Sequence, residues 1–140
     1  MYLTKEEKRT DMGISLHTVG ITVKDLGKAL QFYRILGLPI PEGQDNEHHV
    51  EYTSDNGYSI GFIPESTMLQ TNPHWQAPTG DNRISLQFGC DTPAQVNETY
   101  DKLVASGFKS FKEPWDAFWG QRFAQVIDPD GNNVAFFADL

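Results

Sequence analysis

A β-type segment that leads into a helical one is the first pattern of apolar and polar positions along the chain. Residues 14–23 are mostly apolar and rich in β-branched side chains, a pattern that predicts a strand. From Asp25 onward the apolar positions recur at helical spacing, and Asp25 itself is a suitable N-cap. Gly37 can adopt the left-handed conformation in which many helices end. We therefore predict a helix between Asp25 and Gly37.

Three extended segments are predicted after this helix. They are expected near residues 38–41, at 48–53 and at 58–63, where β-branched, aromatic and polar residues are interspersed. The sequence Asp-Asn-Gly at 55–57 predicts the turn between the last two. The first half of the chain thus has the order strand, helix and three strands.

The second half repeats that order. A strand is predicted over residues 83–90, and the sequence Thr-Pro-Ala-Gln at 92–95 supplies an N-cap, a first-turn proline and a capping-box glutamine. This second helix is expected to end at Gly107. The extended segments that follow are 108–112, 121–127 and 132–138. The sequence Asp-Pro-Asp-Gly at 128–131 is interpreted as a turn with a structural role.

Two tandem βαβββ modules therefore fill the chain. They predict an α+β fold in which a curved mixed sheet surrounds a cavity, closed by pairing the modules or by pairing two chains. Residues 14–140 are expected to form a single domain, with module one at 14–63, a connector at 64–82 and module two at 83–140. Residues 1–13 form an N-terminal extension.

Alternation along each predicted strand separates a helix-facing side from a cavity-facing side. The side chains assigned to the helix-facing core are Val19, Ile21, Val23, Ile84, Leu86 and Phe88. The opposite positions carry mostly small, hydroxyl-bearing or amide-bearing side chains, which leave room for a ligand and offer groups to orient it. The candidate ligand-binding residues are Thr18, Thr22, Glu51, Ser59, Gly61, Ser85, Gln87, Trp115, Trp119, Phe123, Gln125, Ala135 and Phe137.

Several aromatic residues gather shortly before the last two strands. Trp115, Phe118 and Trp119 lie in a segment rich in Pro, Asp and Gly, which predicts a loop. Their rings could stack on a flat or cationic ligand, or instead cover the sheet edge or fill a contact between two chains. Trp75, in the connector, is interpreted as an anchor for the connector or an interface.

The charge balance narrows the choice of partner. The chain has 140 residues and a net charge of −8, and no Lys or Arg occurs between Arg34 and Arg83. The acidic residues of that stretch are Glu42, Asp45, Glu47, Glu51, Asp55, Glu65 and Asp81. A nucleic-acid binder needs a basic surface, so nucleic acid is excluded as a partner. The acidity favours a neutral or cationic ligand, or serves only as a solvated surface.

Cysteine content and hydropathy indicate the compartment. The single cysteine, Cys90, cannot form an internal disulfide, which is typical of a reducing environment. Cys90 falls on the apolar side of its strand and is interpreted as a buried, inert thiol. No run of about 18 apolar residues is present, and the N-terminus is charged without an apolar signal core. We expect a cytoplasmic protein with no membrane segment.

Four short motifs occur in order along the two modules. They are Thr-Val-Lys-Asp-Leu at 22–26, Phe-Tyr at 32–33, Leu-Gly-Leu at 36–38 and Asp-Pro-Asp-Gly-Asn at 128–132. Together they closely resemble the vicinal-oxygen-chelate superfamily, which includes glyoxalase I, extradiol dioxygenases and bleomycin-resistance binding proteins. The resemblance covers nearly the whole chain, and the segment 113–124 is similar to the metal-free branch of the glyoxalase and bleomycin-resistance proteins.

The resemblance implies a homodimer, often with exchanged N-terminal elements, a purpose that residues 1–13 could serve. It also implies where a metal would bind in metal-dependent members, with one ligand on the first strand and one on the last strand of each module. These positions correspond to Thr18, Gly61, Ser85 and Ala135. None is His, Cys, Asp or Glu, whereas a catalytic metal needs about three such ligands. We therefore predict no metal and no other cofactor.

The histidines leave one alternative open. His49 and Glu51 share a strand face and could form part of an off-register set of two histidines and one carboxylate. His17 directly precedes Thr18 and is therefore expected to point toward the helix. No nucleophile elbow and no glycine-rich phosphate loop are present.

The sequence favours a protein that binds a small polar-aromatic or cationic molecule without a metal, and it assigns no catalytic residue. The first alternative is a metal-dependent lyase, isomerase or dioxygenase of the same superfamily with off-register ligands. An enzyme without metal, in which Glu51 acts as a general base, belongs to the same class of hypothesis. A protein interaction module with a vestigial cavity is the third possibility.

Overall fold

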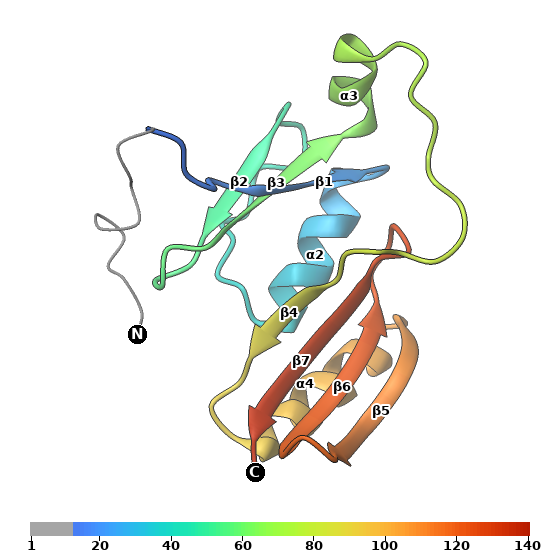
Figure 1. Cartoon of the computed structure of the whole chain (residues 1–140). Coiled ribbons are helices and arrows are strands. Elements are labelled where there is room, and N and C mark those ends of the chain that lie inside the picture. The colour runs from blue at the N-terminus through green and yellow to red at the C-terminus, as the bar shows by residue number, and fades with distance from the viewer. Residues whose placement is uncertain (1–12) are drawn as a thin grey trace.

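Two mixed β-sheets and the helices packed on them form the framework of the computed structural model, which describes residues 13–140 (Figure 1). The elements of module one are β1 (Val19–Val23), α2 (Leu26–Leu36), β2 (Val50–Thr53) and β3 (Ser59–Pro64). Its sheet has the order β1-β3-β2, in which β1 runs parallel to β3 and β2 antiparallel to it. The connector contains α3 (Glu65–Thr71).

Module two repeats this arrangement with one more strand. Its elements are β4 (Leu86–Gly89), α4 (Pro93–Ala105), β5 (Lys109–Ala117), β6 (Gln121–Ile127) and β7 (Asn133–Asp139). The sheet order is β4-β7-β6-β5, and the first strand again pairs in parallel with the last one. The predicted α+β fold with two related modules is confirmed, as two separate mixed sheets that do not close into a barrel.

Both long helices begin where the sequence predicts. The Asp25 carboxylate accepts a hydrogen bond from the Lys28 amide at 3.0 Å, and the Thr92 hydroxyl accepts one from the Gln95 amide at 3.2 Å. The Gln95 side chain accepts in turn from the Asp91 amide at 2.8 Å, one residue before the N-cap. These bonds cap the start of each helix, where backbone amides lack the usual acceptor one turn earlier.

The predicted strand at 38–41 does not form. Arg34 explains why, since its side chain binds the carbonyl groups of this segment: Nε donates to the Ile40 oxygen at 3.0 Å and Nη2 to the Pro41 oxygen at 2.6 Å. Backbone groups bonded to a guanidinium are not available for a sheet ladder. Module one therefore has a three-stranded sheet where module two has four strands.

Helix α3 was not predicted within the connector. Its N-cap is Pro64, it has no side-chain capping bond, and none of its residues is buried. A helix without a cap signal or an apolar stripe leaves no periodic pattern in the sequence.

Strand bounds in module two also differ from the prediction. β4 begins at Leu86 instead of residue 83, and Ile84, which was assigned to the core, is 72% exposed. The assignment of Ile84 to the helix-facing core was therefore wrong, because alternation holds only within the strand itself. β5 extends to Ala117, so Trp115 lies on a strand and not in a loop.

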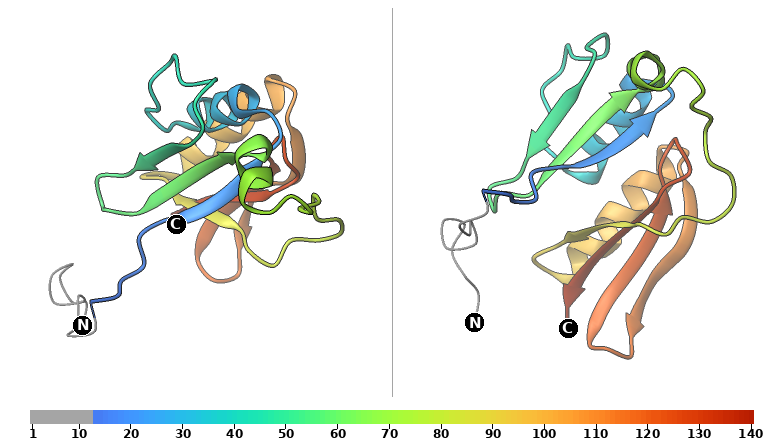
Figure 2. Two further views of the ribbon diagram at one scale, coloured as in Figure 1. Left: turned by 90° about the horizontal axis from the view of Figure 1, so that it is seen from above. Right: turned by 45° about the horizontal axis from the view of Figure 1, so that its top comes forward.

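A single core joins the two modules. Fully buried side chains from α2, β3, β6 and β7 belong to one cluster. In it the rings of Phe32 and Phe108 pack edge-on with their centroids 4.8 Å apart, and the ring centroids of Tyr33 and Phe62 are 5.1 Å apart. Helices α2 and α4 make the main contact between the modules. The right-hand view of Figure 2 shows both helices behind their sheets, which leaves one face of each sheet without a helix. No helix within residues 13–140 is long and apolar enough to cross a membrane.

Candidate functional site

The open face of the first sheet carries a small polar cluster. The hydroxyl of Thr18 donates to Glu51 Oε1 at 2.7 Å, and His17 Nδ1 lies 3.3 Å from the same oxygen. Gly61 lies beside Glu51 in the register of β2 and β3. A Cβ atom at Gly61 would be 3.0 Å from His49 Nε2 and 3.2 Å from the Thr18 methyl group. The glycine thus lets the His49 and Thr18 side chains converge over the sheet.

The place of His17 differs from the prediction. Strand β1 begins only at Val19, so alternation does not apply to the two residues before it. His17 contacts the Thr18 hydroxyl as well as Glu51, with its side chain 80% exposed. The expectation that His17 points toward the helix was wrong.

The donor set of this cluster does not match a metal centre. No group of three or more His, Cys, Asp or Glu side chains could hold a metal ion in the described part of the chain. Thr18, Gly61 and Ala135 have no ligand of the required type, and neither does Ser85, which lies just before β4. The cluster can accept and donate hydrogen bonds, and its carboxylate can attract a cation.

The open face of the second sheet carries a row of aromatic rings. Trp115 is paired with Phe123, and Phe123 with Phe137, in the registers of β5, β6 and β7, so the three side chains share one face. Trp119 lies edge-on to Trp115 at 5.5 Å and to Phe123 at 5.4 Å, while Phe123 and Phe137 are stacked at 6.1 Å. We call Trp115, Trp119, Phe123 and Phe137 the aromatic row. Beyond it Phe118 is 92% exposed in the turn between β5 and β6.

Amide groups continue this face beyond the aromatic row. Gln125 Nε2 donates to Asn133 Oδ1 at 2.9 Å, and Gln87 Nε2 lies 3.3 Å from the Ser85 hydroxyl. Ala135 is paired with both Gln87 and Gln125 in the sheet register, so its small side chain lies between the two amides. The face combines planar rings with amides that can donate and accept.

The predicted site residues thus form two groups instead of one. Thr18, Glu51 and Gly61 lie together on the first sheet. The group on the second sheet consists of Ser85, Gln87, Trp115, Trp119, Phe123, Gln125, Ala135 and Phe137. Ser59, the first residue of β3, shares a hydrogen bond of 2.8 Å with the Thr53 hydroxyl. Thr22 lies near the C-terminal end of β1. The two groups are on separate sheets, and the modules meet chiefly through their helices.

Cys90 follows the end of β4 and packs against the hydrophobic core. Its thiol is partly buried, and burial raises its pKa, with the charge of Asp91 acting in the same direction. A raised pKa lowers the thiolate fraction at neutral pH.

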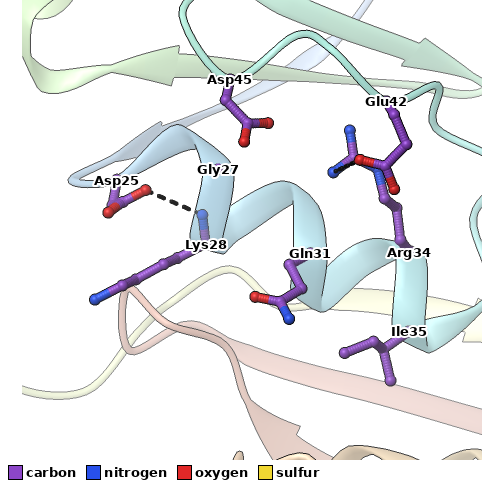
Figure 3. Close-up of a pocket in the computed structure, with 8 residues that line it drawn as sticks. All are labelled: Asp25, Gly27, Lys28, Gln31, Arg34, Ile35, Glu42 and Asp45. Atoms are coloured by element: carbon purple, nitrogen blue, oxygen red, sulfur yellow. Dashed lines mark hydrogen bonds and ion pairs between the residues drawn. The ribbon is translucent and has the colours of Figure 1, made fainter.

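Two hollows lie away from the open sheet faces. The first, of about 590 Å³, lies between α2 and the loop after it (Figure 3). Its charged groups serve the fold: Arg34 holds the loop and lies 3.3 Å from Glu42, and a Cβ at Gly27 would come within 2.8 Å of the Asp45 carboxylate. The second, of about 490 Å³, lies beside β1 and the connector and includes Trp75 and Asp130. The second hollow carried no sequence signal, since its residues come from distant segments.

Comparison with known proteins places this geometry in a family. Residues 15–136 match the family model described as the Glyoxalase/Bleomycin resistance protein/Dioxygenase superfamily. None of the curated proteins matches the chain by sequence.

Solved structures show the same fold. A glyoxalase/bleomycin resistance protein/dioxygenase family enzyme from Burkholderia phytofirmans PsJN has a TM-score of 0.75 at 22% identity, over 91% of this chain and 100% of that one. A hypothetical protein from S. aureus has a TM-score of 0.73 at 23% identity, over 89% and 92%. A glyoxalase/bleomycin resistance protein from Albidiferax ferrireducens T118 has a TM-score of 0.67 at 25% identity, over 89% and 98%.

Proposed function

Because the chain belongs to the glyoxalase/bleomycin resistance protein/dioxygenase superfamily, we propose that it binds a small polar-aromatic or cationic molecule without a metal. The observation that carries this proposal is the aromatic row, with ring centroids 5.4 to 6.1 Å apart on an open sheet face. Planar rings of this kind bind a flat ligand by stacking and attract a cation through their faces. The proposal also includes a cytoplasmic location for the protein.

The polar cluster of the first sheet supplies the second wall of the binding site. Glu51 has a side chain that is 34% exposed and is already oriented by Thr18. A carboxylate held in this way favours a cationic or hydrogen-bond-donating ligand. The walls lie on separate sheets of one chain. The proposal therefore includes a homodimer in which the wall of one chain meets the other wall from its partner across a cavity.

Binding can be tested with proflavine, a planar aromatic cation. Trp119→Ala removes one ring of the row and Glu51→Gln removes the charge while keeping the shape. Each is expected to weaken proflavine binding about fivefold, measured by fluorescence titration. Glu98→Gln, an exposed residue of α4, is the control and leaves binding unchanged. Equal binding of proflavine by wild type and both site variants would show that the ligand binds elsewhere.

Mixing the two variants tests the homodimer. If each site takes Glu51 from one chain and Trp119 from the other, a mixed dimer of Glu51→Gln and Trp119→Ala chains contains one intact site. After exchange of subunits about one quarter of all sites should then regain wild-type affinity. If no site regains wild-type affinity, both walls of a site belong to the same chain or the ligand binds to one wall alone.

One observation favours a second candidate function. His17 Nδ1 lies 3.3 Å from Glu51 Oε1, and His49 lies on the same face over Gly61, although the three side chains do not form a metal-binding group in this structure. The alternative is therefore a metal-dependent lyase, isomerase or dioxygenase with off-register ligands. Dialysis against zinc, nickel and ferrous iron, followed by elemental analysis, distinguishes this alternative from metal-free binding. A stoichiometric metal that is lost in both His49→Ala and Glu51→Ala would overturn the proposal of metal-free binding.

A further inference from the structure

The second hollow, of about 490 Å³, is a groove beside the free edge of β1, on the side of the first sheet that faces module two. Four consecutive residues of β1, Val19 to Thr22, form one side of it. The connector segment from Ala77 to Ile84, together with Trp75, forms the other side, and Leu86 at the start of β4 also lines it. The turn from Asp130 to Asn132 is also part of its lining. The groove is separate from the aromatic row and the Glu51 cluster.

Two unpaired sheet edges border this groove. Within residues 13–140, β1 pairs only with β3 and β4 pairs only with β7, so each is an edge strand. In a parallel pair, alternate residues of a strand direct both backbone groups to the partner, and the remaining residues direct theirs to the open edge. The β1 edge therefore presents backbone donors and acceptors to the groove at a two-residue spacing.

Apolar and aromatic groups flank these backbone groups. Val19 and Ile21 alternate with Gly20 and Thr22 along β1, and across the groove Ile84 is 72% exposed. Gly20 leaves the edge without a side chain at its centre, although a Cβ there would lie 3.1 Å from the Ile63 methyl group on the neighbouring strand. This surface combines a strand template with shallow apolar walls.

The charge of the groove is negative. Its lining includes the carboxylates of Glu65, Asp81 and Asp130 and a single guanidinium, that of Arg83. Asp130 Oδ1 accepts from the Lys24 amide at 2.8 Å, and its second carboxylate oxygen is buried and has no partner among the described residues. A cationic side chain in the groove would be attracted by this excess of carboxylates.

We propose that this groove accepts an extended peptide segment with Lys or Arg side chains, which adds as a strand to the free edge of β1. Backbone hydrogen bonds to the edge supply affinity, and alternate side chains of the segment meet the apolar walls and the carboxylates. The partner is thus an extended basic segment of another protein.

The test uses three probes and the nitrogen-15-labelled protein. The first is the capped pentapeptide Val-Lys-Val-Lys-Val, the second is capped Val-Glu-Val-Glu-Val, and the third is n-butylamine. The amide signals of Gly20, Gly80 and Gly131 report on the groove, while that of Gly120 reports on the aromatic row. The lysine peptide is expected to shift the three groove signals at about 1 mM, and the other two probes are not.

Three results would overturn strand addition. The first is no shift of the groove signals with the lysine peptide. The second is an equal shift with the glutamate peptide, which would remove the charge argument. The third is an equal shift with n-butylamine, which would show a site for a small ammonium group and not for a peptide.

Substitutions test whether the carboxylates of the groove attract the lysine peptide. The double variant Glu65→Gln and Asp81→Asn should weaken binding of the lysine peptide about fivefold, because it removes two of the three carboxylates. Glu98→Gln is again the matched control, with unchanged affinity expected. Equal affinity in the double variant and the control would contradict the proposal. The double variant leaves Trp119 and Glu51 unchanged. A negative result with the peptide therefore contradicts strand addition alone and has no bearing on the binding of proflavine.

Discussion

The Tyr33 hydroxyl donates a 2.7 Å hydrogen bond to Asp128 Oδ2 and so joins the helix of module one to the last turn of module two. Both residues are buried. Asp128 also accepts bonds of 2.9 Å from the amides of Asp130 and Asn132 and from the Asn132 side chain. A buried carboxylate with four donors is well compensated, so the turn and the module contact depend on the same group.

Tyr33→Phe should destabilise the protein by about 1.5 to 3 kcal/mol, since it removes a hydrogen bond to a charged group in the core. Urea denaturation measures the loss as a lower free energy of unfolding. Tyr58→Phe is the control, because Tyr58 is 73% exposed and has no such bond within the described residues. A Tyr33→Phe protein as stable as the control would show that the bond adds nothing to stability.

Ionisation of Tyr33 should accompany alkaline unfolding. Burial raises the pKa of Tyr33 well above its usual value, and the charge of Asp128 raises it further. The native state therefore holds this proton more tightly than the unfolded chain does. The resulting stability is complete below the unfolded pKa of about 10 and is lost as the pH rises above it. Absorbance at the phenolate band should show one tyrosine titrating together with loss of structure.

Asp130→Asn should stabilise the protein at neutral pH. Burial raises the pKa of Asp130, and the charges of Asp128, Glu65 and Asp25 add to it, while the Lys24 amide lowers it. Because the native state binds this proton more tightly, ionisation costs stability as the pH rises from below about 4 through the folded pKa. Asparagine keeps an acceptor for Lys24 without the charge. Thermal unfolding at pH 7 and at pH 3 should show a gain that is present only at the higher pH.

Thr92→Ala should cost about 1 kcal/mol, because the Gln95 amide loses the side-chain acceptor at the start of α4. Thr92→Ser keeps the hydroxyl and should stay close to wild type. Chemical denaturation of both variants measures the difference. Equal stability of the alanine and serine variants would mean that water replaces the cap at no cost.

Local signals explain why much of the fold could be predicted. Asp25 and Thr92 are caps, and each precedes a helix whose apolar residues recur at helical spacing. The repeated order of strands and helices follows from period-two and helical patterns that neighbouring residues carry themselves. The strand at 38–41 was the exception, because the Arg34 side chain takes its carbonyl groups. That competition is invisible in a pattern of apolar and polar positions.

Alternation within strands predicted which residues share a face, and it failed at positions that lie before a strand begins. Glu51 and Gly61 share a face as expected, and Phe123 and Phe137 do so on the second sheet. His17 and Ile84 precede their strands, so their side chains follow the path of the loop and not the pleat of the sheet. No residue pattern marks the start of either strand.

The sequence by itself determined the tandem modules, their caps and the residue types on each sheet face, since these depend on short-range periodicity. Only the tertiary structure decided that Thr18 and Glu51 are separated from Trp115 and Trp119, because sheet order depends on contacts between distant segments. The same holds for the pair Tyr33 and Asp128, 95 positions apart, and for the groove beside β1, whose walls meet only when the connector folds across the sheet edge.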